Sequence, residues 1–247
     1  MSAQKMMVNA VDPAGKWLYR VGGISALILG LGYLVTIPLF VSVGSASGGA
    51  EARLIYLAKN TTGWWAIFGL MVLTDFLFVP VALSLYLALK GINKNVMLLA
   101  TACVGLFIVL DLAVTWANYA ALITLSGDYA AAANAAQRAA FVAAASYPVA
   151  VLDSIMAGIC AILTLSSGIL LIGFVMLKGV FNKMTAYLGL LTGLSGIVAV
   201  VGPLFISALS AATMINALLA TIWIFLVGFR LYQLGQRHLF STEKTFA

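Results

Sequence analysis

Residues 63–90 read GWWAIFGLMVLTDFLFVPVALSLYLALK, and this stretch decides the class of protein. It contains one acidic residue, Asp75, and no basic residue before Lys90. A membrane's hydrocarbon core is about 30 Å thick, and a helix of about 20 predominantly apolar residues crosses it. Because residues 63–90 are longer than that and almost wholly apolar, they predict a transmembrane helix.

The rest of the chain has the same character. Its 247 residues are 64% hydrophobic and 8% charged, with a mean hydropathy of +1.12, whereas a soluble domain carries about 25% charged residues. Lipid must therefore be its main solvent. We expect an all-α polytopic membrane protein, a single domain over residues 1–247 that forms a six-helix transmembrane bundle and ends in a polar cytoplasmic tail. The predicted helices lie near residues 17–43, 63–90, 96–125, 149–177, 185–206 and 212–234, and the tail covers 235–247.

The distribution of basic residues predicts the orientation. Of the 13 Lys and Arg, only Arg53, Lys59 and Arg138 fall in the connections on one side of the predicted bundle. Cytoplasmic connections carry an excess of Lys and Arg, so the side with few of them is the outside. An even number of crossings then places both termini in the cytoplasm, and we expect a multi-pass protein of the cell membrane.

Two outer connections are too long to be simple turns. Residues 44–62 include the segment Glu51–Lys59, which alternates charged and apolar residues in the manner of a short amphipathic helix at the membrane interface. Residues 128–147 are rich in alanine, which has the highest helix propensity. We expect an external helix there that ends near Pro148.

Several function classes are disfavoured by composition. The basic residues occur singly between apolar stretches, so we expect no nucleic-acid partner. Cys103 and Cys160 fall within apolar helices, where free buried cysteine is the ordinary state. The single histidine, His238, argues against haem held by paired histidines and against histidine-rich zinc sites. No Walker loop, HExxH, GxSxG or paired CxxC motif occurs. The sequence identifies no cofactor and no metal, and the expected partner is the lipid bilayer.

Three aspartates inside the apolar stretches are the strongest functional signal. A carboxylate at the centre of a membrane helix costs about 2.5–3.5 kcal/mol on insertion scales. At about 1.5 Å per residue, Asp75 and Asp111 lie roughly 18 and 21 Å below the outer ends of adjacent antiparallel helices, whereas Asp153 lies roughly 6 Å deep. If Asp75 and Asp111 face each other, both cannot stay ionised without a cation.

Other polar residues extend this pattern along the predicted helices. Asp111, Thr115 and Asn118 recur at helical spacing, and Asp153 begins a similar stripe that includes Cys160. Such stripes should face the bundle interior, because lipid offers their polar groups no partner. The alternative is that they are interhelical hydrogen bonds, each adding about 0.6 kcal/mol. The candidate ligand-binding residues are Asp75, Asp111, Thr115, Asn118, Asp153 and Asn216.

Small residues mark the expected helix contacts. In the first predicted helix, Gly22, Ala26 and Gly30 occur at intervals of four residues. In the fifth, Gly189 and Gly193 form a GxxxG pattern. Small residues at this spacing let two helix backbones approach closely within a membrane, so we expect packing roles.

Residues 17–23 (WLYRVGG) and 179–193 (GVFNKMTAYLGLLTG), together with the six-helix plan, resemble the family catalogued as domain of unknown function 4386. The resemblance covers most of residues 15–235. The chain differs in its cytoplasmic turn, where the resemblance leads us to expect a proline near Asn182. It implies a six-helix integral membrane fold, and it transfers no activity and no functional residue.

The sequence leaves three functions open. The first is a non-enzymatic membrane protein that binds or transports a small solute or cation through an outward-facing polar cavity, with Asp75 and Asp111 as its deep charge site. The second is an accessory or scaffold subunit that binds other membrane subunits, in which the aspartates are buried helix contacts. The third is a lipid-modifying enzyme that uses Asp75 and Asp111 as acid and base.

Overall fold

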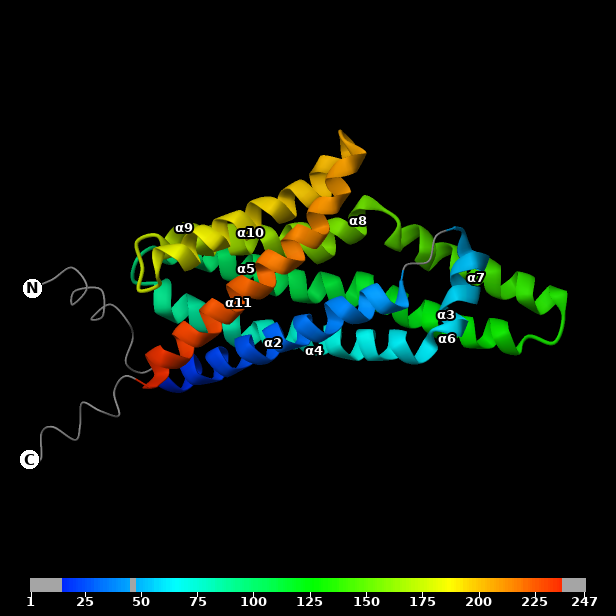
Figure 1. Cartoon of the computed structure of the whole chain (residues 1–247), viewed down its shortest axis with the longest axis horizontal. Helices are drawn as coiled ribbons and strands as arrows, with labels where there is room; N and C mark the ends of the chain where they lie inside the picture. Colours follow the sequence, from blue (N-terminus) through cyan, green and yellow to red (C-terminus); the bar gives the residue numbers. More distant parts are fainter. Residues whose placement is uncertain (1–14, 45–47, 237–247) are drawn as a thin grey trace, which may run out of the picture.

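Helices make up almost all of the described chain. The structure is a computed structural model that describes residues 15–44 and 48–236. No strand occurs within these ranges, so the all-α class is confirmed. The elements (Figure 1) are α2 (Lys16–Val43), α3 (Ala50–Lys59), α4 (Thr61–Leu89), α5 (Lys94–Leu110), η2 (Asp111–Trp116), α6 (Ala117–Ala131), α7 (Ala135–Leu152), α8 (Ile155–Gly158), η3 (Ile159–Leu163), α9 (Thr164–Met176), α10 (Lys183–Val201), η4 (Gly202–Leu204), η5 (Ser207–Ala211) and α11 (Ala212–Gln236).

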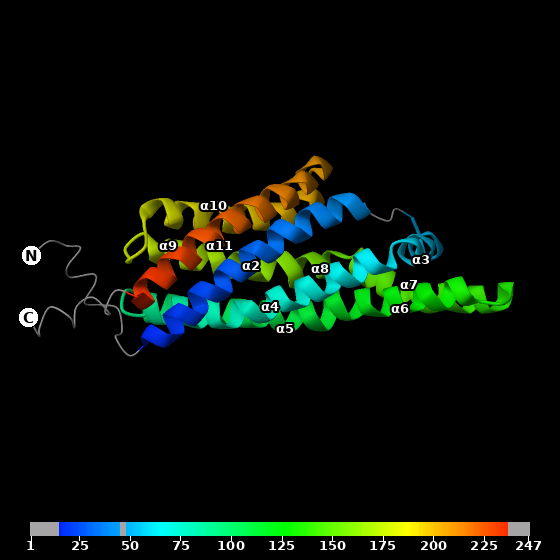
Figure 2. The same ribbon diagram turned by 60° about the horizontal axis from the view of Figure 1, so that its bottom comes forward.

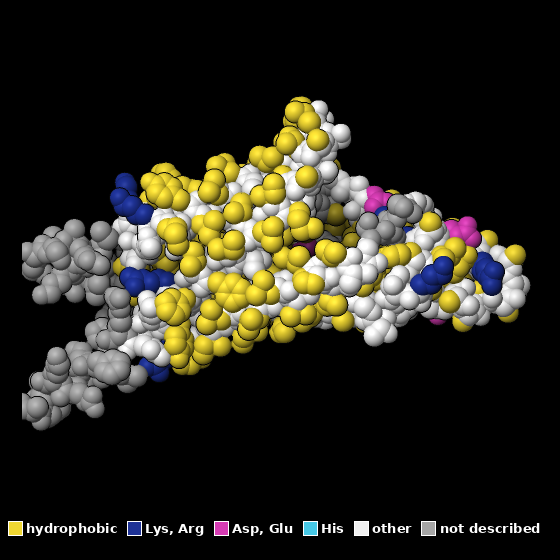
Figure 3. All heavy atoms as spheres, in the orientation of Figure 1, with side chains coloured by type: hydrophobic (Ala, Val, Ile, Leu, Met, Phe, Trp, Pro, Cys, Tyr) yellow, Lys and Arg dark blue, Asp and Glu magenta, His cyan; other side chains and the backbone are white. Residues whose placement is uncertain are grey.

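Apolar side chains cover the outside of the bundle. Large hydrophobic residues of α2, α4, α5, α7, α8, α9, α10 and α11 are more than half exposed, and Figure 3 shows apolar side chains spread along the bundle. Seven helical runs of the described chain are long and apolar enough to cross a membrane. The chain is a multi-pass membrane protein. The exposed residues include Leu31, Val109, Phe174, Leu191 and Phe229.

The described chain has one candidate span more than the six predicted helices, because α7 also qualifies by length and composition. The predicted external helix does not end at Pro148, which lies inside α7. A proline removes one backbone donor but keeps a helical φ, so a helix that has room for its ring can continue through it. The chain breaks instead at Asp153 and Ser154, where α7 ends and α8 begins.

One continuous helical run is longer than a membrane is thick. Residues Lys94–Ala131 form α5, η2 and α6 without a break, and at 1.5 Å per residue the 38 residues span about 57 Å. In Figure 1, the hairpin of α6 and α7 extends beyond the ends of the other long helices. We call this the outer end, and we call the opposite end, where α2, α5 and α10 begin with Lys16, Lys94 and Lys183, the basic end.

The basic half of the bundle has its own hydrophobic core, built from α2, α4, α5, α9, α10 and α11. We call it the inner core; Leu85, Met97, Met176 and Leu231 are among its fully buried members. Helix α2 crosses between α11 and α4 and contacts both (Figure 2).

Glycines bring the helices of the inner core together. A Cβ on Gly23 would lie 2.6 Å from the backbone nitrogen of Tyr232 in α11. A Cβ on Gly189 would lie 2.8 Å from the indole nitrogen of Trp223. The same crowding holds at Gly22, Gly30 and Gly193, so the predicted packing role of these glycines is confirmed.

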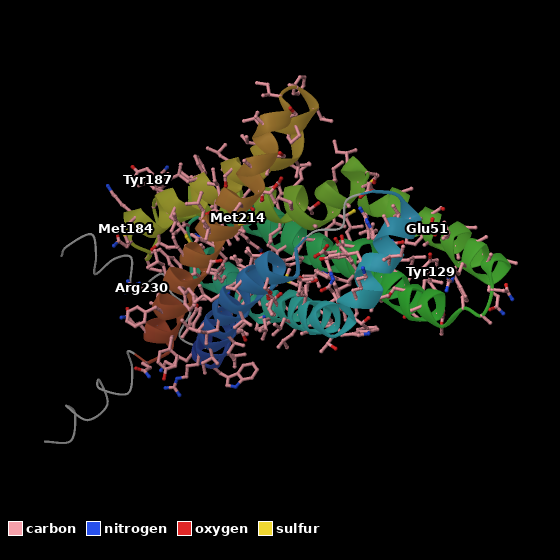
Figure 4. The ribbon with its side chains drawn as sticks, turned by 45° about the vertical axis from the view of Figure 1, so that its right-hand side comes forward. Glu51, Tyr129, Met184, Tyr187, Met214 and Arg230 are labelled. Atoms are coloured by element: carbon pink, nitrogen blue, oxygen red, sulfur yellow. The ribbon has the colours of Figure 1, made fainter. Side chains whose placement is uncertain are left out.

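The outer end has a second, more aromatic core, which we call the outer core. Its buried members are Leu54, Leu57, Trp64, Ile67, Trp116, Leu122, Ile123, Tyr129, Ala145 and Val149. The predicted amphipathic helix is present as α3, and its apolar face packs on α6 and α7. Figure 4 shows Glu51 of α3 beside Tyr129 of α6, whose hydroxyl donates to the Glu51 carboxylate at 2.8 Å.

Candidate functional site

Asp75 lies at the midpoint of α4 and is 1% exposed. Neither of its carboxylate oxygens has a hydrogen-bond partner among the described residues. Burying a polar group without a partner costs several kcal/mol, and burying an ionised one costs more. A side chain placed so unfavourably for stability is a candidate for function.

Asp111 begins the π-helical segment η2 and is 3% exposed. Its Oδ2 accepts a hydrogen bond from the indole nitrogen of Trp116 at 3.1 Å. In an α-helix, residues five apart point about 140° away from each other. The wider π turn reduces that angle, and it allows Trp116 to reach the carboxylate. Single π turns inside α-helices are frequent at functional sites.

Asp75 and Asp111 lie near enough for the charge of Asp111 to act on Asp75. Their carboxylates interact electrostatically, and Tyr33 of α2 interacts with both. Cys160 of the second π-helical segment, η3, interacts with Asp111, and η2 packs against η3. We call Tyr33, Asp75, Asp111, Thr115 and Cys160 the deep acidic site.

Two further predicted residues follow Asp111 on the same run. Thr115 is buried, and its side chain interacts with the Asp111 carboxylate one turn earlier. Asn118 is half-buried and donates to the carbonyl oxygen of Val114 on its own helix at 2.6 Å. Thr115 therefore joins the deep acidic site, whereas the amide of Asn118 is engaged locally.

Asp153 is not part of the predicted stripe with Cys160. It caps the C-terminal end of α7, and the chain turns at Ser154 before α8 and η3 begin, so the helical spacing between the two residues is broken. The Asp153 side chain is 53% exposed and forms an ion pair with Arg53 of α3 at 2.8 Å.

Asn216 joins two helices. Its amide nitrogen donates to the carbonyl oxygen of Thr192 at 2.7 Å and to the hydroxyl of Ser195 at 3.0 Å, both in α10. Asn216 therefore matches the alternative stated in the sequence analysis, in which a polar residue forms hydrogen bonds between neighbouring helices.

Sequence reasoning missed Tyr33, Arg53 and Trp116 as parts of the site. A tyrosine deep inside an apolar span is a signal, because a buried hydroxyl needs a polar neighbour. Arg53 was the available countercharge for Asp153. The contact of Trp116 depends on the π turn, which has no recognisable pattern in the sequence.

A cavity of about 210 Å³ lies at the outer end, and we call it the outer cavity. Tyr119 in its wall interacts electrostatically with Arg53 and Asp153, and also with Asp111 of the deep acidic site. The outer cavity is lined by Phe40, Gly44, Arg53, Tyr56, Leu57, Trp64, Tyr119, Leu152 and Asp153.

The donor set is poor for a transition metal. Within residues 15–44 and 48–236, no group of three or more His, Cys, Asp and Glu side chains could hold a metal ion.

No protein-family model, curated protein or solved structure matches the chain.

Proposed function

We propose that this membrane protein binds a small cation at the deep acidic site, and that the cation enters from the outer end. The bound species is a proton shared by Asp75 and Asp111 or a monovalent metal ion held between them. The observation that carries the proposal is that two buried carboxylates lie within electrostatic reach of each other, and that neither oxygen of Asp75 has a hydrogen-bond partner among the described residues.

The charges at this depth need a cation. Asp75 and Asp111 are the two buried residues of the described chain whose side chains are charged in water at neutral pH, and both are acidic. The cost of removing a carboxylate from water is several kcal/mol per ion even after relaxation. A shared proton or a bound cation offsets this cost and also removes the repulsion between the two groups.

The chemistry of the site favours a hard monovalent ion over a soft metal. The carboxylates and the hydroxyls of Thr115 and Tyr33 supply oxygen, which hard cations prefer. Movement of the ion onward to the basic end is a separate step, because the closely packed inner core lies in that direction.

The test is the melting temperature of the purified protein in sodium, potassium or choline chloride at constant ionic strength, and at several pH values. A ligand that binds only the folded state at 100 times its Kd stabilises it by about 2.7 kcal/mol. We expect such a response in the wild type, its loss in Asp75→Asn and in Asp111→Asn, and its retention in Asp128→Asn, which changes an exposed acid on α6.

Each outcome has a distinct meaning. A response to sodium or potassium identifies a metal ion, and a response to pH alone identifies the shared proton. If the wild type responds to neither and Asp75→Asn is mildly destabilised, the aspartates are helix contacts, as in a scaffold subunit.

We also propose the orientation and the family. Both termini lie in the cytoplasm and the outer end faces outward across the cell membrane, because the basic end carries most of the Lys and Arg. A cysteine at Asn134 should react with an impermeant thiol reagent in intact cells, and one at Asn93 or Asn182 should not. Membership of the family catalogued as domain of unknown function 4386 rests on residues 17–23 and 179–193.

A further inference from the structure

We propose that the outer cavity binds one small zwitterionic organic molecule, with its anionic group on Arg53 and its ammonium group on Asp153. The outer cavity is a separate site from the deep acidic site. Zwitterion binding in the outer cavity does not require a cation at the deep acidic site. Its occupant would be the organic solute of the protein, in addition to the small cation.

The size of the cavity limits the ligand. The outer cavity has a volume of about 210 Å³. Pockets for drug-sized ligands are about 300–1,000 Å³. The outer cavity therefore suits a molecule about the size of an amino acid.

The walls are aromatic and held in place by their own contacts. The rings of Trp64 and Tyr119 stack with centroids 5.1 Å apart, and Phe40 meets Trp64 edge-on at 5.7 Å. The Tyr56 hydroxyl accepts from the indole nitrogen of Trp64 at 3.3 Å and donates to the carbonyl oxygen of Val43 at 3.0 Å. These hydroxyl and indole groups are therefore satisfied, and the walls offer an apolar, preformed surface to the carbon skeleton of a ligand.

The charges of the cavity require a ligand with both signs. Arg53 donates from one Nη to the Asp153 carboxylate at 2.8 Å, while its buried Nε has no partner among the described residues. The planar guanidinium is suited to hold a second carboxylate or phosphate through two donors. A lone anion would meet the repulsion of Asp153, and a lone cation that of Arg53. A zwitterion satisfies both side chains without net charge.

Two sources supply this chemistry, a free amino acid and the headgroup of a zwitterionic phospholipid. Isothermal titration calorimetry on the purified wild type with L-leucine, L-phenylalanine and glycerophosphoethanolamine distinguishes them. Isoamylamine and 4-methylpentanoate, which keep the leucine side chain but lack one of the two charges, test the need for both. Binding of an amino acid identifies a free solute, and binding of glycerophosphoethanolamine alone identifies a lipid headgroup.

Variants of the ion pair give the sharper result. Arg53→Gln and Asp153→Asn should each weaken binding of the zwitterion about tenfold or more, because each removes a charge-assisted hydrogen bond. Asp153→Asn should bind 4-methylpentanoate more tightly than the wild type does, and Arg53→Gln should bind isoamylamine more tightly. The matched controls are Arg138→Gln and Asp128→Asn, which change charges that do not line the outer cavity.

The proposal is overturned if the wild type binds none of the three zwitterions, or if Arg53→Gln and Asp153→Asn, each monodisperse and helical, bind them as the wild type does. Asp75→Asn and Asp111→Asn separate this site from the proposed cation site. Both variants should lose the cation response and keep zwitterion binding.

Discussion

The inner and outer cores of this protein are built by different means. The inner core is aliphatic, and its helices meet at glycines such as Gly23 and Gly189, where a single added carbon would strike the next helix. The outer core is aromatic, and ion pairs and hydrogen bonds such as Arg53–Asp153 surround it. In lipid there is little hydrophobic driving force for helices to associate, so close van der Waals packing must stabilise the inner core. In the orientation that we propose, the outer end extends into water, where burial of large aromatic side chains is favourable.

The deep acidic site lies where the two cores meet. Leu112 of η2 packs against both of them, and Trp116, which bonds Asp111, belongs to the outer core. The packed aliphatic residues of the inner core therefore separate the site from the basic end. This difference between the two cores supports the proposal that the cation enters from the outer end.

The largest expected effect is in the outer core, at Trp64. Its ring packs on Phe40, Tyr56 and Tyr119, so Trp64→Ala should reduce the free energy of unfolding by about 3–5 kcal/mol. The neighbouring Trp65 is 43% exposed and is a matched control; Trp65→Ala should cost about 1 kcal/mol. Chemical denaturation in detergent, followed by circular dichroism, measures both. Equal losses in the two variants would contradict an aromatic outer core.

The next effect is in the inner core, at Gly23. A Cβ there meets the backbone of α11, which cannot move aside, so Gly23→Ala should cost about 1–3 kcal/mol. Gly105 of α5 has nothing within 4 Å of such a Cβ, and Gly105→Ala should be neutral or stabilise the helix by about 1 kcal/mol. Unfolding of the two variants under identical conditions compares them. If Gly23→Ala is harmless, close helix approach does not hold the inner core.

A smaller effect is expected from the bond between α10 and α11. Asn216→Ala removes the hydrogen bonds to Thr192 and Ser195. Such bonds in membranes average about 0.6 kcal/mol, so the free energy of unfolding should fall by about that amount, without any change in the cation response. If this variant lost the cation response, Asn216 would be part of the cation-binding site, as the sequence predicted.

The smallest effect on stability is expected at the ion pair of the outer cavity. Asp153 is more than half exposed, and exposed ion pairs contribute about 0–1 kcal/mol. Asp153→Asn should therefore unfold almost as the wild type does while it loses zwitterion binding. A large loss of stability would make the pair a structural link between α3 and α7.

The sequence predicted the parts of the fold that depend on composition and regular spacing. Apolar length placed the helices, and small residues placed their contacts, because both follow from the lipid solvent. The break at Asp153 could not be predicted, because Pro148 was the stronger local signal and tertiary packing overrode it. The π turns at Asp111 and Ile159 shift the register of the polar stripes, and nothing in the residue types marks them.

The central claim is that Asp75 and Asp111 form one cation site, and infrared difference spectroscopy of the purified protein tests it most directly. Exchange of choline for sodium or potassium, or a step in pH, should change the carboxyl and carboxylate bands of the wild type. The change should be absent in Asp75→Asn and in Asp111→Asn and unaltered in Asp128→Asn. If no band changes in the wild type, or if the same change persists in Asp75→Asn, the two aspartates do not share a cation.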